Sequence, residues 1–127
     1  QLSPRVCSPG SSLSLTLFWA SSRDGAYISE NYTVFVHLSD ESGHIWSQAD
    51  GQPVGGMRPT SSWQEDEVIS DTRKLALPLD IPAGRYQITT GMYNWATGQR
   101  LVASGPGVMP DNRIVLSEIQ IIVPERL

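Results

Sequence analysis

Apolar and polar residues alternate along several short segments of this chain, and this alternation constrains the fold more than any other feature. From residue 13 to residue 19, every second position holds Leu or Trp, and the positions between them hold Ser, Thr and Phe. Because successive side chains of a strand point to opposite faces, this period predicts strands with one buried face. No segment of ten or more residues keeps the 3.6-residue apolar period of an amphipathic helix. The chain is therefore predicted to be all-β.

Turn-forming residues separate the alternating segments and set the number of strands. The extended segments that we predict, after the first at 12–19, are 32–49 as a hairpin, 68–77, 86–92, 100–103 as the strand that returns from a loop at 94–98, and 114–123 as one strand or a pair. Seven to nine short strands joined by short turns are typical of a two-sheet antiparallel β-sandwich, either immunoglobulin-like or jelly-roll-like.

The alternation stops between residues 50 and 66, where the sequence reads DGQPVGGMRPTSSWQED. A loop of this length without regular structure is uncommon in a compact domain, and such loops are often functional or packed across a face. This segment is the first place in the sequence to look for binding residues.

Length and charge limit the classes of function. With 127 residues the chain has the size of one domain, and we predict a single β-sandwich domain over residues 1–127. The net charge is −4 and the nine basic residues are dispersed, which argues against nucleic acid as a partner. No apolar run approaches the ~20 residues that a membrane helix needs, so we expect no direct membrane insertion by this segment.

The sequence assembles no recognisable catalytic or metal site. Cys7 is the single cysteine, so neither an internal disulfide nor a zinc site of Cys/His spacing is predicted. A calcium site needs several carboxylates and carbonyls that converge on one point, and a glycosidase needs two carboxylates across a cleft. The acidic run Glu65–Glu67 is interpreted as a solvated part of the loop. We therefore predict no metal, no cofactor and a domain that is not itself an enzyme.

Three consecutive stretches together resemble a known family. They are PGSSLSLTLFWASS, NYTVFVHLSDESGHIWSQADGQPVGG and MRPTSSWQEDEVISDTRKLALPLDIPAGRYQITTGMYNWATGQRL. They resemble the C-terminal soluble β-sandwich domain of bacterial multi-span membrane glycosyltransferases that are similar to dolichyl-phosphate-mannose–protein mannosyltransferases. The resemblance covers about residues 9–123. The chain departs from the family pattern at Gln64–Asp66, where proline-glycine is usual, and at Asn94, where aspartate is frequent.

The resemblance implies location more than chemistry. In such enzymes catalysis belongs to the membrane part, so a non-catalytic accessory module is expected here, excised from the longer membrane protein. The implied place is the extracytoplasmic face of a bacterial membrane, periplasmic or at the cell surface, with tethering through the parent protein. The implied partners are a glycan or polysaccharide and the membrane domain of the parent. The alternative is a structural or protein-interaction module that packs on the membrane domain or mediates oligomerisation.

Aromatic and polar residues near predicted loops are the candidate ligand-binding residues. They are Trp46, Asp50, Arg58, Trp63, Tyr93, Trp95 and Arg100. Sugars stack their C–H faces on aromatic rings and exchange hydrogen bonds with charged side chains.

Each candidate has a structural alternative. Trp63 can anchor the 50–66 loop to the sheet, and Trp46 can cover a sheet face. Asp50 or Asp71 can pair with an arginine to brace loops, and His37, which is predicted on an outer strand face, can make a structural hydrogen bond.

Overall fold

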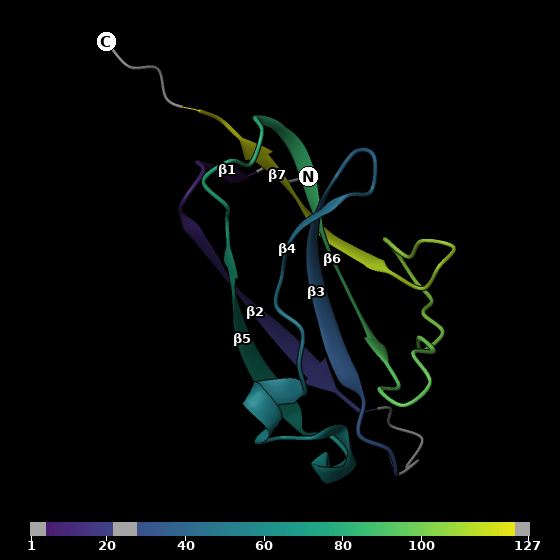
Figure 1. The fold of residues 1–127 in the computed structure, drawn as a ribbon. Coiled ribbons are helices and arrows are strands. Elements are labelled where there is room, and N and C mark those ends of the chain that lie inside the picture. The colour runs from purple at the N-terminus through teal and green to yellow at the C-terminus, as the bar shows by residue number, and fades with distance from the viewer. Residues whose placement is uncertain (1–4, 22–27, 124–127) are drawn as a thin grey trace.

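Seven strands form two sheets in the part of the chain that the computed structural model describes, residues 5–21 and 28–123. The strands are β1 (Arg5–Cys7), β2 (Ser12–Ala20), β3 (Thr33–Asp40), β4 (Ile45–Gln48), β5 (Val68–Ala76), β6 (Gly84–Tyr93) and β7 (Ile114–Ile121). One sheet has the order β1-β7-β6-β3-β4, and the other consists of β2 and β5 (Figure 1). No helix among the described residues is long and apolar enough to cross a membrane.

The predicted all-β fold with two sheets is confirmed, and two strand details differ. β1 was not predicted, and it pairs in parallel with β7, so the first and last strands of the chain are neighbours. Residues 100–103 were predicted as a strand, but they contribute only the single bridge between Arg100 and Tyr93. The segment 114–123, predicted as one strand or a pair, forms one strand.

The core lies between the two sheets and consists of side chains from the inner positions of both and from the connection between β5 and β6. Its buried members are Leu13, Leu17, Val34, Val36, Leu38, Leu75, Leu77, Ile81, Tyr86, Ile88, Ile119 and Ile121. Trp19 and Trp46 are partly buried and pack against this cluster. The alternating positions of β2, β3 and β5 supply half of these side chains, so the sequence pattern and the burial agree.

β3 and its neighbour β6 each carry consecutive buried residues, so both of their faces are covered. Val34, Val36 and Leu38 point into the core, while Phe35, on the opposite face, is also only 2% exposed. Part of the outer face of the five-stranded sheet is therefore also shielded from solvent. This is uncommon, because an antiparallel sheet with a single core usually exposes one face to water.

A buried ion pair joins β5 to the chain segment that follows β4. Asp71 and Arg73 are 1% and 9% exposed, and an Arg73 Nη2 donates to the Asp71 Oδ2 at 2.9 Å. The same guanidinium donates to four backbone carbonyls, of Ala49 at 2.9 Å, Gly51 at 3.0 Å, Gln52 at 3.2 Å and Val34 at 3.5 Å. The predicted alternative of an aspartate–arginine pair that braces loops is thus found here, between residues of one strand.

The Asp71 carboxylate also fixes the start of the long loop. Its Oδ1 accepts from the amide of Val54 at 3.1 Å, and its Oδ2 lies 3.3 Å from the indole nitrogen of Trp19. Val54 has a φ of 54°, a left-handed conformation that is costly for a β-branched residue. The loop continues through two short 3-10 turns, Pro53–Gly56 and Thr60–Ser62.

Replacement of Arg73 by methionine tests the importance of this pair. Arg73→Met leaves the Asp71 carboxylate buried without its cation, so we expect the free energy of unfolding to fall by about 3–5 kcal/mol. Urea denaturation measures the change. Lys74→Met, at the exposed neighbouring position, is the control and should change stability by less than about 0.5 kcal/mol. Equal, small effects of the two substitutions would contradict this view of the fold.

Candidate functional site

The outer face of the five-stranded sheet carries a three-layer stack. The Phe35 ring lies on Gly91 of β6, where a Cβ atom would come within 2.5 Å of the ring carbons. Above the ring, the Arg100 guanidinium carbon is 4.9 Å from the ring centroid, a cation–π contact. Glycine at position 91 is therefore required for the ring to lie flat on the sheet and to carry the arginine.

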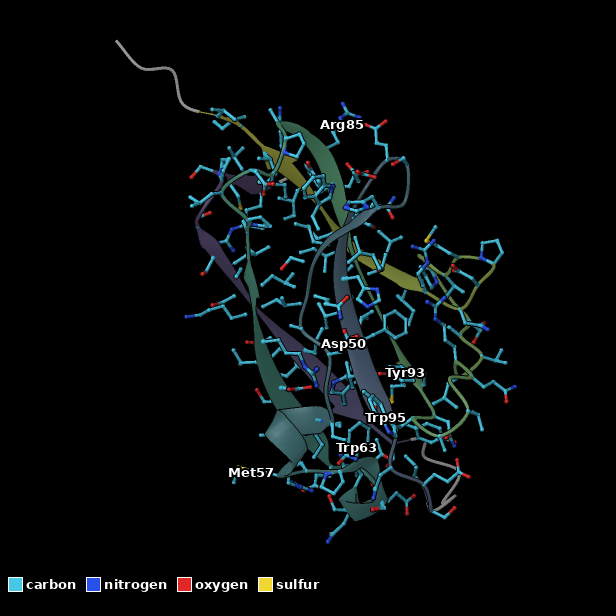
Figure 2. All side chains as sticks on the ribbon, in the orientation of Figure 1. Asp50, Met57, Trp63, Arg85, Tyr93 and Trp95 are labelled. Atoms are coloured by element: carbon cyan, nitrogen blue, oxygen red, sulfur yellow. The ribbon has the colours of Figure 1, made fainter. Side chains whose placement is uncertain are left out.

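This stack forms one wall of a pocket of about 320 Å³. The residues that line the pocket are Phe35, His37, Gln48, Asp50, Tyr93, Gly98 and Arg100. They come from β3, the end of β4 and the segment after it, the end of β6, and the loop between β6 and β7. Figure 2 shows Asp50 and Tyr93 on this face of the sheet. Three of the predicted site residues, Asp50, Tyr93 and Arg100, are thus brought together.

The Asp50 carboxylate is held in place by two contacts. Its Oδ1 accepts from the amide of Val36 at 3.1 Å, and its Oδ2 lies 3.4 Å from the His37 Nε2. The side chains of His37 and Asp50 are 13% and 25% exposed. A carboxylate fixed from one side in this way keeps lone pairs directed toward the open pocket.

Arg100 is also positioned by its neighbours. One Nη1 donates to the carbonyl of Asp111 at 3.1 Å and lies 3.4 Å from the Asp111 Oδ2, while Arg113 Nε donates to the same carboxylate oxygen at 2.7 Å. Desolvation raises the pKa of the Asp111 carboxyl, but the nearby Arg113 and Arg100 outweigh it and hold that pKa below its usual value. Arg100 therefore presents its remaining N–H groups at a fixed place.

The loop after β6 holds Trp95 at the rim of the pocket. The Asn94 side-chain oxygen accepts from the amides of Ala96 at 2.9 Å and Thr97 at 3.3 Å, an Asx-type turn. Trp95 is 78% exposed, and its ring centroid lies 6.4 Å from that of Tyr93. The predicted hairpin loop at 94–98 is present, and its tryptophan is beside the pocket but not among the lining residues.

Trp63 and Arg58 lie outside the pocket and hold the long loop. Trp63 is 8% exposed, stacks on Trp19 with 6.4 Å between ring centroids, and donates its indole N–H to the carbonyl of Arg58 at 2.9 Å. Arg58 Nη2 donates to Glu67 Oε1 at 2.6 Å, and this bond lowers the pKa of the Glu67 carboxyl. The geometry matches the alternative in which Trp63 anchors the loop.

Trp46 also lies outside the pocket, on β4 next to the turn between β3 and β4. Its indole N–H donates to the Asp40 Oδ2 at 2.9 Å, and its ring meets the His44 ring edge-on at 4.7 Å. The indole, followed by the hydroxyl of Ser42, lowers the pKa of Asp40 to about 2. Because the Trp46 side chain is held by Asp40 and His44, it is not available to a ligand in the pocket.

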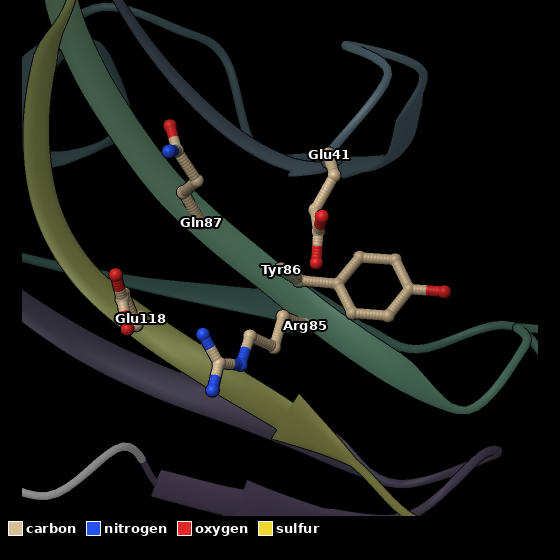
Figure 3. Close-up of a pocket in the computed structure, with 5 residues that line it drawn as sticks. All are labelled: Glu41, Arg85, Tyr86, Gln87 and Glu118. Carbon is tan, nitrogen blue, oxygen red and sulfur yellow. The ribbon is translucent and has the colours of Figure 1, made fainter.

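A second, smaller hollow of about 170 Å³ lies toward the other end of the same sheet. Figure 3 shows Arg85 on β6, Glu118 on β7 and Glu41 from the β3–β4 turn around it. Tyr86 also borders this hollow, but it is only 4% exposed and donates its hydroxyl to the carbonyl of Pro82 at 2.6 Å. The hollow therefore offers charged side-chain ends without an accessible ring face.

Four lining residues were not among the candidate site residues of the sequence: Phe35, His37, Gln48 and Gly98. The signal for two of them was present, because Phe35 and His37 alternate with the core valines of β3 and must share the outer face. The position of Gln48 depends on the register of β4, in which Gln48 is opposite His37. That register contains an irregularity between Leu38 and Ser39, which the sequence does not reveal.

Replacement of Gly91 by alanine tests the stack under the pocket. The added methyl group would overlap the Phe35 ring, so we expect Gly91→Ala to lower the free energy of unfolding by about 1–3 kcal/mol. In a Phe35→Leu background the same change should cost less, because the smaller side chain leaves room. Urea denaturation of the four proteins gives the coupling energy. Additive effects would show that the ring and Gly91 are not in contact.

The described residues contain no group of three or more His, Cys, Asp or Glu side chains that could hold a metal ion. No protein-family model, curated protein or solved structure matches this chain. The functional interpretation therefore depends on the geometry of the pocket and on the sequence resemblance.

Proposed function

We propose that this domain is a non-catalytic carbohydrate-binding module and that the pocket around Asp50, Tyr93 and Arg100 is its site. The observation that carries the proposal is that the partly exposed Tyr93 ring lines the same pocket as fixed hydrogen-bond acceptors and donors. Such a combination suits a sugar, which has an apolar C–H face and hydroxyl groups around its edge.

Each part of a sugar ring finds a partner in the pocket. The C–H face packs against the Tyr93 ring. The Asp50 carboxylate accepts hydrogen bonds from hydroxyl groups, and Arg100 and Gln48 donate hydrogen bonds to hydroxyl oxygens. Because Asp50 and Arg100 are already held by the protein, little side-chain freedom is lost on binding.

The lining favours binding over hydrolysis. It contains one carboxylate, Asp50, whereas glycoside hydrolysis generally uses two carboxyl groups that face each other across the scissile bond. The Asp50 carboxylate is bonded to the Val36 amide and lies beside His37, an arrangement that suits an acceptor of fixed position.

The sequence resemblance supports a further part of the proposal, namely that the domain is an accessory module of a bacterial membrane glycosyltransferase on the extracytoplasmic side. In that setting the glycan is the acceptor or product of the parent enzyme, and the membrane domain is the second partner. The full-length gene product tests this part: multiple membrane spans before the domain support it, and their absence would overturn it.

Titration with sugars tests the binding site. Glucose, mannose, galactose and their oligosaccharides are added to the ¹⁵N-labelled domain, and chemical shifts and calorimetry report binding. Asp50→Asn keeps the shape of the side chain but removes the charge that accepts hydroxyl hydrogen bonds. We expect it to weaken binding about tenfold or more.

Phe18→Ala is the control, because Phe18 is an aromatic residue that is 71% exposed and lies on the other, two-stranded sheet. It should leave the affinity unchanged. The absence of saturable binding by all of these sugars at millimolar concentration would refute the proposed function.

A second candidate function, a structural module that oligomerises, is favoured by the edge of β2. Among the described residues β2 pairs only with β5, and its nine residues contain no charged residue and no proline. Long edge strands usually carry such residues to prevent pairing with another chain. Beside this edge lies a groove of about 230 Å³ between β2 and β7, where Leu15 and Leu116 are among the lining residues.

The occupant that we propose for this edge is β2 of a second copy, in antiparallel pairing around Thr16. The outward Ser and Thr side chains of the two strands carry no charge, so their approach is not opposed electrostatically. In this arrangement the two small sheets become one continuous sheet of four strands.

The oligomeric state tests the second candidate. Thr16 and Thr72 share one hydrogen bond of 2.9 Å between their hydroxyl groups, so lysine at either position removes the same bond. Thr16→Lys places two like charges opposite each other at the free edge and should convert a dimer to a monomer, whereas Thr72→Lys should not. Light scattering measures the mass over a concentration series, and a strictly monomeric native domain would exclude this candidate.

A further inference from the structure

We propose that the pocket takes an internal stretch of a glycan chain, with one sugar unit on Tyr93 and the adjacent unit stacked on Trp95. This inference rests on the proposed carbohydrate-binding function and specifies the class of ligand: an oligosaccharide or polysaccharide of at least two units instead of a free monosaccharide.

The first observation is the place of Trp95. It is adjacent to the pocket, with 6.4 Å between its ring centroid and that of Tyr93 and an angle of 34° between the rings, yet it is not part of the pocket lining. A single sugar that fills the pocket on Tyr93 leaves Trp95 uncovered. A second, linked sugar that leaves the pocket on this side meets the indole next, because Trp95 lies near Tyr93 (Figure 2).

The second observation is that the loop that carries the exposed indole is held in place by hydrogen bonds before any ligand binds. The Asn94 amide donates to the carbonyl of Gln99 at 2.9 Å, and the Gly98 amide donates to the carbonyl of Asn94 at 2.7 Å. The Asn94 side chain in turn donates to the Glu30 Oε2 at 3.3 Å. Stacking on a ring whose loop is already fixed costs little conformational entropy, so an exposed Trp in this setting is suited to binding.

The third observation is the openness of the pocket walls. The side chains of Asp50 and Arg100 are 25% and 34% exposed, although they are the charged groups that fix the ligand. A site for one small molecule usually buries about 70–90% of the surface of its ligand. Because the charged side chains of the pocket walls remain partly exposed, a glycan chain can enter and leave the pocket on either side.

A length series distinguishes a chain from a single unit. Two series are used as probes, from glucose to cellotetraose and from mannose to mannotetraose. In the series that binds, we expect the affinity to rise at least about fivefold from one unit to two, because the second unit adds an aromatic contact. Trp95→Ala should reduce the affinity for the tetrasaccharide to that for the monosaccharide, and Trp95→Phe should retain part of the gain.

The indole N–H signal of Trp95 gives an independent readout. It is assigned as the tryptophan side-chain signal that is lost in Trp95→Phe. The tetrasaccharide should shift this signal and those of Asp50 and Tyr93, whereas the monosaccharide should shift only the latter two.

The outcomes separate this inference from the proposed function. Equal affinity for one and four units, or a tetrasaccharide affinity that Trp95→Ala leaves unchanged, would overturn the chain-binding inference and leave carbohydrate binding in place. No binding by any member of either series would count against both. Phe18→Ala, the exposed aromatic on the other sheet, should leave the whole length dependence as in the native protein.

Discussion

The buried pair of Asp71 and Arg73 is the interaction on which both the fold and the pocket depend. The Arg73 guanidinium donates hydrogen bonds to the carbonyls of Ala49 and Gly51 from inside the sandwich. Asp50 lies between these two residues, and its carboxylate points to the outer face, where it meets the Val36 amide. A single buried cation therefore fixes the backbone on both sides of the acidic group of the pocket. Loss of that cation would disturb the site even though Arg73 does not line it.

The pocket also depends on the use of both faces of β3. The inner side chains of this strand belong to the core, and the outer ones, Phe35 and His37, belong to the pocket. Because Gly91 on the neighbouring strand has no side chain, the Phe35 ring sinks onto the sheet and Arg100 can lie above it. Groups that are placed by strands and by a buried ring keep their positions better than groups placed by loops alone. The binding groups are therefore preorganised by the same packing that stabilises the sheet.

The sequence predicted the fold and part of the site for identifiable physical reasons. Period-two alternation is a local signal, so the longer strands and the burial of Leu13 and Val34 followed directly from it. β1 has only three residues and pairs with β7 from the other end of the chain, which no local pattern reveals. Asp50 and Tyr93, both members of the candidate set, line the same pocket, whereas Trp63 lies outside it. Its burial depends on a partner, Trp19, that is distant in sequence and becomes a neighbour only through tertiary packing.

An open pocket of modest size is well matched to a module that is tethered beside an enzyme. Under the proposed function, the membrane anchor of the parent keeps the module close to the growing glycan, so the effective concentration reaches the millimolar range for a short linker. A site of low affinity is sufficient under that condition. Each further contact, such as stacking on Trp95, then raises this affinity by a further factor. A weak and open site also releases the chain quickly, since affinity differences reside mainly in the dissociation rate. A chain that must move after each addition needs such a site, whereas a closed pocket around a single sugar would hold it in place.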